Sequence, residues 1–378
     1  MKRSNIPEKN MSISKVYFTD FRTAGYGNGV LPKLEKLMKK AGFENLDFQN
    51  RFAAIKLHFG ESGNMAFLRP QYAGTVAGYV KRLGGIPFLT DCNTLYAGSR
   101  KNAVEHIYTA EMNGFSLLAA SAPILIGDGL KGSDEVSVPI PNGVHLTEAK
   151  IGRQIMDADL FISLTHFKGH EKMGFGGTVK NIGMGCASRA GKMELHSDGK
   201  PVAESDVCIG CGSCMPYCAH GALKMTSGKM WVDHTLCTGC GACISRCPVT
   251  ALQPTWDQSD RLLDEKTAEY ASAVLSGRPH FHISILNNIT PDCDCHGDND
   301  AAILPDIGML VSADPVAIDQ AAADLCNAAP RIAHSHLEGK KNTGDVFHDA
   351  HEKSRWQDTI EHGEKIGLGS RKYELIHL

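Results

Sequence analysis

Eight cysteines in a doubled pattern constrain this chain more than any other feature of its sequence. The spacing C-x2-C-x2-C-x3-C occurs over residues 208–218 and again over residues 237–247. Where two such runs occur together, each run gives three thiolates to one [4Fe–4S] cluster and its last thiolate to the other. The pattern therefore predicts two [4Fe–4S] clusters. The predicted ligands of the first are Cys208, Cys211, Cys214 and Cys247, and those of the second are Cys237, Cys240, Cys243 and Cys218.

One position departs from the usual form of these runs. Ala219 follows the first run where a proline is expected, whereas Pro248 is present after the second. Proline supplies no thiolate, so the change affects the turn and leaves Cys218 as a predicted ligand. The alternative is a pair of zinc knuckles or a set of free thiols. Zinc motifs usually combine two C-x2-C units, so the doubled order favours iron–sulfur clusters.

Length and charge exclude several functions. With 378 residues, the chain is too long for a small electron carrier and long enough for two or three domains. Its formal charge is −3 and no long basic run occurs, which speaks against nucleic-acid binding. The longest apolar run, residues 116–126, is too short to cross a bilayer, and the start has no apolar signal region. We therefore expect a cytoplasmic protein with no membrane partner, in which thirteen cysteines indicate metal rather than disulfides.

Outside the cysteines, short β-rich runs alternate with helix-like runs. Strands are predicted around residues 16–18, 53–59, 86–91, 122–128, 157–166, 282–288 and 307–313. Helices are predicted over residues 31–42, 69–85, 99–114 and 260–276, and from Pro315 onward. This alternation predicts an α/β domain with a largely parallel sheet.

The cysteines interrupt this alternation instead of following it. We expect residues 1–200 to form the first part of an α/β host domain and residues 256–378 its second part with a C-terminal tail. Residues 201–255, here called the cysteine-rich segment, are expected to form an inserted small α+β ferredoxin-like domain. The tail beyond residue 327 shows no clear pattern.

Polar side chains follow the predicted strands of the host repeatedly. Since ligands of parallel α/β sheets bind outside the carboxyl ends of the strands, these residues predict a cleft. Histidines there can transfer protons, and lysines with glycine amides can hold an anionic group. A solvated loop is the alternative. The candidate catalytic residues are His58, Glu61, His166, Lys168 and His170, and Asp91, Asp128, Lys180 and Asp314 also follow strands or lie in these loops.

A second polar stretch, CDCHGDND at residues 293–300, combines thiols, an imidazole and carboxylates. Cys293, Cys295 and His296 could bind an additional zinc or iron ion, or the two cysteines could form a redox-active pair. An acidic turn with buried thiols is the alternative. Asp314 is expected to cap the helix that Pro315 begins. The three single cysteines are expected to be small buried apolar residues: Cys92, Cys186 and Cys326.

Several blocks together resemble one known family. KLHFGE, TDCNTLYAGSR, HFKGHEKMGFGGTVKNIGMGCASRAGK, PDCDCHGDND and SADPVAIDQA are similar to the domain of unknown function family 362, over residues 14–327. Some members of that family carry an inserted two-cluster ferredoxin domain. The resemblance implies an iron–sulfur-centre protein with an α/β host domain, and it supplies no reaction.

Three functions fit these observations. The first is an oxidoreductase in which two clusters exchange electrons with a small, anionic substrate in the strand-end cleft. The second is a non-enzymatic ferredoxin-like electron carrier that docks onto a redox partner protein. The third is a metal enzyme whose clusters are structural or regulatory. The crowded polar residues at the strand ends favour the first.

Overall fold

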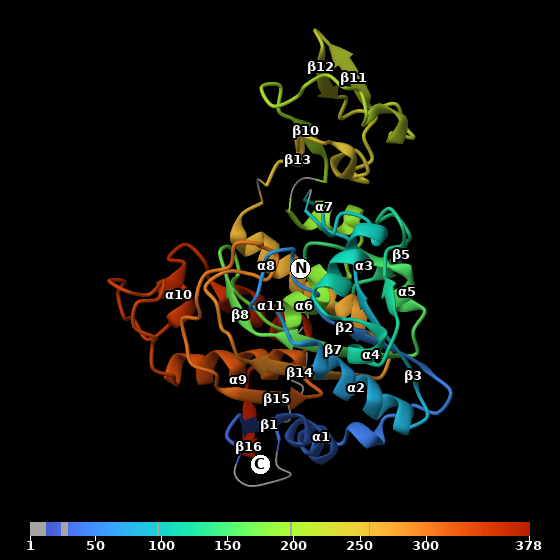
Figure 1. Ribbon diagram of the computed structural model, residues 1–378. Helices are drawn as coiled ribbons and strands as arrows, with labels where there is room; N and C mark the ends of the chain where they lie inside the picture. The colour runs from blue at the N-terminus through green and yellow to red at the C-terminus, as the bar shows by residue number, and fades with distance from the viewer. Residues whose placement is uncertain (1–12, 24–28, 97, 197–198, 257) are drawn as a thin grey trace, which may run out of the picture.

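The computed structural model describes residues 13–23, 29–96, 98–196, 199–256 and 258–378. Its main element is one eight-stranded sheet with the order β16-β1-β15-β14-β7-β2-β3-β4 (Figure 1). The strands are β1 (Ser14–Asp20), β2 (Phe52–Lys56), β3 (Ile86–Asp91), β4 (Ile124–Ile126), β7 (Leu160–His166), β14 (His280–Leu286), β15 (Gly308–Ser312) and β16 (Tyr373–His377).

The sheet is largely parallel, as predicted. Strands β4, β3, β2, β7 and β14 run side by side in one direction. Strand β15 is antiparallel to both of its neighbours, β14 and β1, and β16 lies parallel to β1 at the far edge. The α/β fold class is therefore confirmed, with one reversed strand.

Helices cover both faces of this sheet. One apolar core joins the sheet to α1 (Val30–Lys40), α2 (Pro70–Arg82), α3 (Ala103–Met112) and α4 (Leu117–Ala120). The other joins it to α6 (Thr178–Cys186), α8 (Asp260–Leu275), α9 (Pro315–Ala328) and α11 (Trp356–Ile366). The strands contribute side chains to both cores, because successive side chains of a strand face opposite sides of the sheet. In β2, for example, Ile55 lies in the first core and Ala54 lies in the second. Both faces of the central strands are buried, which explains their continuous apolar runs.

Close approaches fix the helices on the second face. The N-terminus of α6 is capped by Asp319 of α9, whose carboxylate accepts from the Thr178 and Val179 amides at 2.6 and 2.8 Å. A Cβ at Gly177 would lie 2.6 Å from that carboxylate. One turn further on, a Cβ at Gly183 would collide with a backbone oxygen of α8. Gly177 and Gly183 therefore permit the close packing of α6 against α9 and α8.

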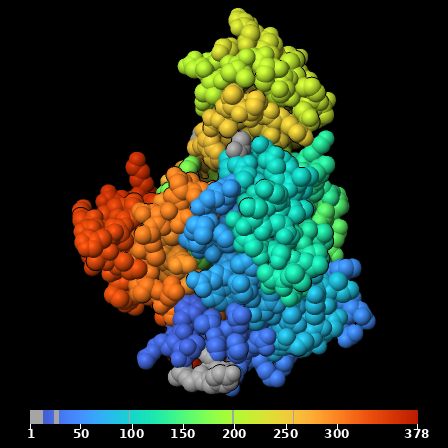
Figure 2. Space-filling view, viewed as in Figure 1, coloured from blue at the N-terminus to red at the C-terminus, as the bar shows by residue number. Residues whose placement is uncertain are grey.

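The cysteine-rich segment lies outside these layers. It enters and leaves the host through a short antiparallel pair, β10 (Pro201–Ala203) and β13 (Leu252–Pro254). A second pair, β11 (Leu223–Thr226) and β12 (Lys229–Val232), lies at its outer end. Figures 1 and 2 show the segment as a lobe at one end of the molecule, opposite β1 and β16. It has a small apolar core of its own, which the host residues Leu95 and Met193 join.

The remaining elements are short or belong to the tail. The host carries the hairpin β5 (Glu135–Pro139) and β6 (Glu148–Gly152), the hairpin β8 (Lys168–His170) and β9 (Gly174–Gly176), and the helices α5 (Arg153–Met156) and α7 (Arg189–His196). The tail, unpatterned in sequence, forms α10 (Val346–Ala350), α11 and β16. Across the described residues, no helix combines the length and apolar character that crossing a membrane requires.

Candidate active-site cleft and cysteine cavities

A cleft of about 420 Å³ opens at the carboxyl ends of β2, β3 and β7. Three of the five candidate catalytic residues line it: His58 after β2, and Lys168 and His170 on the hairpin after β7. Cys293, Cys295 and His296 line it too, although they lie more than a hundred residues further along the chain. The strand-end argument therefore located these six residues at one site.

The cleft is rich in positive charge. Its wall includes two carboxylates, Asp91 and Glu171. Asp91 pairs with Lys56 at 3.0 Å and with Arg100 at 3.4 Å. The cations of the wall outnumber the carboxylates, and they are Lys56, Arg100, Lys168, Lys172, Lys180 and Lys192. Within the described part of the chain, the last three of these have no carboxylate at ion-pair distance, so the cleft offers positive charge to an anion.

His58 and His170 face the cleft in one defined tautomer. The Nδ1 atom of His58 accepts from the Gly60 amide at 3.0 Å, and Nδ1 of His170 accepts from the amides of Lys172 and Met173, each at 3.2 Å. Burial, followed by nearby cations, holds the pKa of both rings well below the ordinary value. Both rings are therefore neutral, with the proton on Nε2, and they can donate a hydrogen bond to a ligand.

Glu61 and His166 lie behind the cleft wall instead of on it. Glu61 accepts from Tyr96 Oη at 3.0 Å, from Arg100 Nε at 3.1 Å and from Ser99. His166 is buried, with Nδ1 2.9 Å from Asp294 and Nε2 2.7 Å from the carbonyl oxygen of Asn287. These contacts occupy the polar atoms of both side chains. The geometry gives the two residues a positioning role, and their participation in proton transfer stays a prediction.

The two thiols after β14 differ in character. Pairing with Cys293 lowers the pKa of the Cys295 thiol, and Lys180 acts in the same direction against the effect of burial. The same pairing, together with burial, raises the pKa of Cys293 well above its usual range. Lys180 Nζ lies 3.9 Å from Cys293 Sγ. The pair can therefore hold one proton between two sulfurs beside a lysine.

His296, the third predicted metal ligand here, has another partner in the structure. Its Nε2 lies 3.5 Å from Glu171 Oε1. This carboxylate raises the pKa of His296 to about 9, so the ring is protonated at neutral pH. A protonated ring cannot bind a metal. In this arrangement His296 serves as an ion-pair partner, and a metal site with the two thiols stays a prediction.

The eight cysteines of the segment surround two cavities. The first cysteine cavity is lined by Cys208, Cys211, Cys214 and Cys247, and the second by Cys218, Cys237, Cys240 and Cys243. In each set, three thiols come from one run and the fourth comes from the other, as the doubled pattern predicts. Ala219 does not remove Cys218 from the second set.

The backbone around these cavities suits an anionic sulfur cluster. Backbone amides point at three of the sulfurs: that of Ala222 at Cys218 (3.2 Å), that of Met230 at Cys208 (3.3 Å) and that of Ala251 at Cys247 (3.1 Å). Gly210, Gly212, Gly239 and Gly241 all adopt positive φ, which lets the chain turn tightly around the sulfurs. The donor set therefore fits two [4Fe–4S] clusters.

The second cysteine cavity lies at the junction with the host. A Cβ at Gly241 would lie 2.9 Å from Arg189 Cγ and 3.4 Å from Leu95 Cδ1. Leu95 also lines the cleft. Arg189 is buried and donates to the carbonyl oxygens of Thr94, Lys101 and Lys131, which belong to the loops beside the cleft. The junction therefore connects one cysteine cavity to the cleft wall.

Two of the polar residues expected at the strand-end cleft, Asp128 and Asp314, do not line it. Asp314 caps α9 as predicted, accepting from the Val316 and Ala317 amides. Asp314 lies at the end of the strands opposite the cleft, because β15 runs antiparallel to β14. Asp128 is buried against Asn93 and does not line the cleft. Sequence reasoning placed Asp294 after a predicted strand without foreseeing its contact with His166, and it did not single out Arg100, which lay in a predicted helix. Cys92, Cys186 and Cys326 are buried, as expected.

Comparison with known proteins identifies one family, and some weaker similarities accompany it. The profile of the domain of unknown function DUF362 matches residues 53–324, well over half of the chain. A ribose 1,5-bisphosphate phosphokinase PhnN of Agrobacterium fabrum is 34% identical over 99 residues. That stretch is 26% of this chain and 49% of the kinase, so the chain spans about half the length of the curated relative it matches.

Two solved structures are similar in part. A lactate racemase apoprotein from Thermoanaerobacterium thermosaccharolyticum is 10% identical, with a TM-score of 0.37 over 74% of this chain and 52% of that one. A Thermotoga maritima protein is 12% identical, with a TM-score of 0.39 over 79% of this chain and 57% of that one. At such low scores these similarities carry no argument about this chain.

Proposed function

The chain belongs to the DUF362 family, and on that premise we propose that it is an iron–sulfur protein with two [4Fe–4S] clusters that exchanges electrons with a ligand in the host cleft. One observation carries the proposal. Two cavities are each lined by four cysteines in the doubled order, and the second of them lies against Arg189 and Leu95 at the cleft wall. When bound, the clusters would supply electrons one at a time.

The domain division is part of the same proposal. We propose that residues 201–255 are an inserted ferredoxin-type domain, with the host formed by residues 1–200 and 256–378. The antiparallel pair of β10 and β13 joins the ends of the segment, and a separate apolar core fills it. A redox partner protein would then meet the exposed outer end. The eight predicted cluster ligands must stay reduced, which suits a reducing compartment such as the cytoplasm.

In the host cleft, Cys293 and Cys295 are proposed as a two-electron store. As a disulfide, the pair accepts two electrons and one proton and becomes the Cys293 thiol and the Cys295 thiolate. The Cys293 sulfur receives the proton on the side that Lys180 faces, and the lysine stabilises the adjacent thiolate. Lys172, Lys180 and Lys192 would hold an anionic substrate nearby, with His58 and His170 as hydrogen-bond donors.

An electron count tests this proposal. Anaerobically purified protein is oxidised with diamide and titrated with reduced methyl viologen. Two clusters take about one electron each and a disulfide takes two, so wild type is expected to consume about four electrons per chain. The variant Cys293→Ala/Cys295→Ala is expected to consume about two, with its iron content unchanged.

The controls separate the competing functions. If wild type and the double variant both consume about two electrons, the thiol store is wrong and the electron-carrier function gains support. If wild type contains no iron and no sulfide, the electron-transfer proposal fails as a whole. Lys172→Met is the matched control, because it also removes a cleft cation, but one that lies over the Trp256 ring and not beside Cys293 as Lys180 does.

A further inference from the structure

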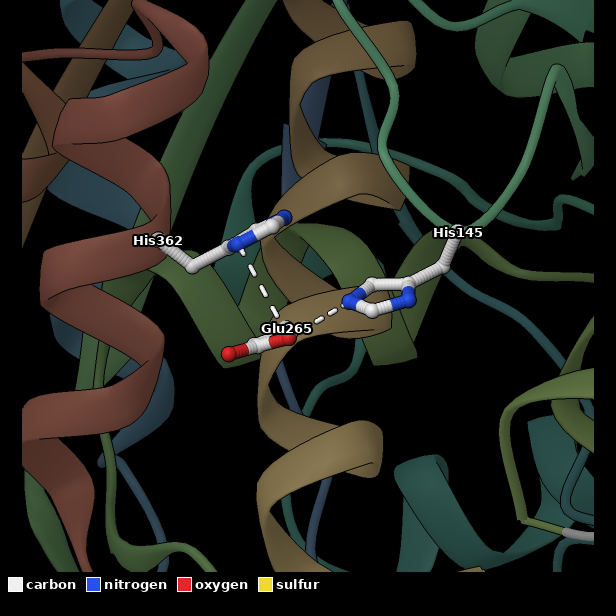
Figure 3. A group of neighbouring side chains, drawn as sticks. All are labelled: His145, Glu265 and His362. Carbon is white, nitrogen blue, oxygen red and sulfur yellow. Dashed lines mark hydrogen bonds and ion pairs between the residues drawn. The ribbon is translucent and has the colours of Figure 1, made fainter.

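A second cluster of metal-binding side chains lies in the host, away from the cleft. His145 is in the loop between β5 and β6, Glu265 is on α8 and His362 is on α11 (Figure 3). Their ligand atoms all lie within 4.8 Å of one another. His145 Nε2 is 2.5 Å from Glu265 Oε2, and His362 Nδ1 is 4.0 Å from the same oxygen. None of the three lines the cleft.

A buried carboxylate orients one of these histidines. Glu269, one turn beyond Glu265 on α8, lies 3.0 Å from His362 Nε2 through its Oε1 atom. Glu269 is fully buried and accepts from the amides of residues 144, 145 and 146 at 2.7 to 2.9 Å. With Glu269 accepting the Nε2 proton, the Nδ1 lone pair of His362 points toward Glu265 (Figure 3). A carboxylate behind a ligating histidine is the usual support of a metal site.

We propose that His145, Glu265 and His362 bind a divalent metal ion of the zinc class. Two imidazole nitrogens and one carboxylate oxygen suit zinc and its neighbours in the first transition row, whereas magnesium and calcium prefer oxygen ligands. Metal–ligand bonds of about 2.0–2.2 Å place adjacent donors about 3 Å apart, so His145 and Glu265 must separate slightly. His145 can move, because it is partly exposed on a loop. Water can fill the remaining position.

The position of this site indicates a structural role. It joins the loop before β6, the helix α8 and the helix α11. Helix α8 is the first helix after the cysteine-rich segment. The chain therefore returns from that segment to the host through α8, and a bound ion would hold α8 against α11 and the loop before β6. This inference does not depend on the proposed electron transfer, because none of its ligands belongs to the cleft or to the cysteine cavities.

Zinc content tests the site directly. Anaerobically purified protein with full iron content is stripped with a mild chelator, dialysed against micromolar zinc and analysed for zinc and iron. Wild type is expected to retain about one zinc per chain, and His145→Gln and Glu265→Gln are expected to lose it. His334→Gln is the matched control, because His334 forms an exposed histidine–glutamate pair with Glu338 and, among the described residues, belongs to no group of three metal-binding side chains.

A thermal unfolding measurement tests whether the retained zinc is bound at this site and stabilises the fold. Added zinc is expected to raise the unfolding midpoint of wild type and of His334→Gln, and to leave both site variants unchanged. Equal zinc content in all four proteins would overturn the proposal. So would zinc that is taken up only as iron is lost, since that zinc would occupy the cysteine cavities. Absence of retained zinc in wild type would also overturn the proposal and leave the three side chains as an ion-paired cluster.

Discussion

Gly241 lies directly against Arg189, so the second cysteine run touches the host at a residue that also holds the loops beside the cleft. An added Cβ at Gly241 would be 2.9 Å from Arg189 Cγ. The Arg189 guanidinium donates to three backbone carbonyl oxygens, and the thiols of Cys240 and Cys243 are near enough to affect its pKa. One buried cation thus belongs to both parts of the molecule.

The charge of Arg189 should set the potential of the cluster in the second cysteine cavity. Removing a nearby positive charge disfavours reduction, so Arg189→Gln is expected to lower one midpoint potential by an amount on the order of tens of millivolts. Arg189→Lys keeps the charge and should change it far less. Potentiometric titration followed by EPR measures both. A shift of both clusters by equal amounts, or none at all, would show that the cavity and the arginine are not electrostatically coupled.

The pairing of the cysteine runs can be tested by counting iron in double variants. Cys218 and Cys240 line the same cavity, so Cys218→Ala/Cys240→Ala should lose one cluster and keep about four iron atoms. Cys211 and Cys218 line different cavities, so Cys211→Ala/Cys218→Ala should lose both. Iron and sulfide analysis separates the two results. The reverse outcome would mean that each run holds its own cluster.

Cys295 should be the more reactive of the two cleft thiols. Its pKa is lowered by pairing with Cys293 and by Lys180, so it is expected to react with iodoacetamide at neutral pH before Cys293 does. Lys180→Met should move the rate profile of Cys295 to higher pH. Lys172→Met should leave it in place. Mass spectrometry of the alkylated peptide gives the rates, and faster labelling of Cys293 would contradict the assignment.

A buried neutral histidine should make the fold sensitive to mild acid. His106 is fully buried on α3, and burial lowers its pKa to about 3. The unfolded chain binds this proton near pH 6.5, whereas the native state does not, so stability falls as pH drops below 6.5. His106→Leu should remove about 2 kcal/mol of the stability lost between pH 6.5 and 5. Urea unfolding at both pH values measures it; an unchanged pH dependence would show that His106 is protonated when folded.

Two glycine substitutions should have opposite effects. A Cβ at Gly183 collides with the α8 backbone, so Gly183→Ala should destabilise the protein by about 1–3 kcal/mol through overpacking. At Gly78, on α2, the nearest atom is the end of the Arg82 side chain at 3.7 Å. Gly78→Ala should therefore stabilise the helix by about 0.5–1 kcal/mol. Thermal unfolding compares them, and equal effects would contradict the close packing of α6 on α8.

Local patterns explain which parts of the fold were predictable. The strand Ile86–Asp91 and the helix start at Pro315 agree with the sequence, because apolar runs, prolines and caps act over a few residues. The direction of β15 could not be predicted, since a strand has the same side-chain pattern either way. Strand β16 joins the sheet by pairing with β1, more than three hundred residues away, and its own sequence carries no sign of this partner.

The same reasoning applies to the cleft. The sequence placed His58, Lys168, His170 and the two thiols at strand ends, and the structure brings them to one wall. The sequence could not show that Arg100 and its neighbours donate hydrogen bonds to the Glu61 carboxylate, because a hydrogen-bond partner depends on the tertiary fold. The same holds for His296, which pairs with Glu171 from another loop.

The ladder between β10 and β13 has a consequence for how such a chain can change over generations. The residues that open and close the cysteine-rich segment are hydrogen-bonded neighbours, with Ala203 opposite Leu252. A turn of a few residues could bridge them, so one deletion would leave the path of the host backbone intact. One insertion at the same point would restore the segment without shifting any strand of the large sheet. After a deletion of the segment, Leu95 and Met193, which now pack into it, would remain on the host as apolar side chains without their present neighbours.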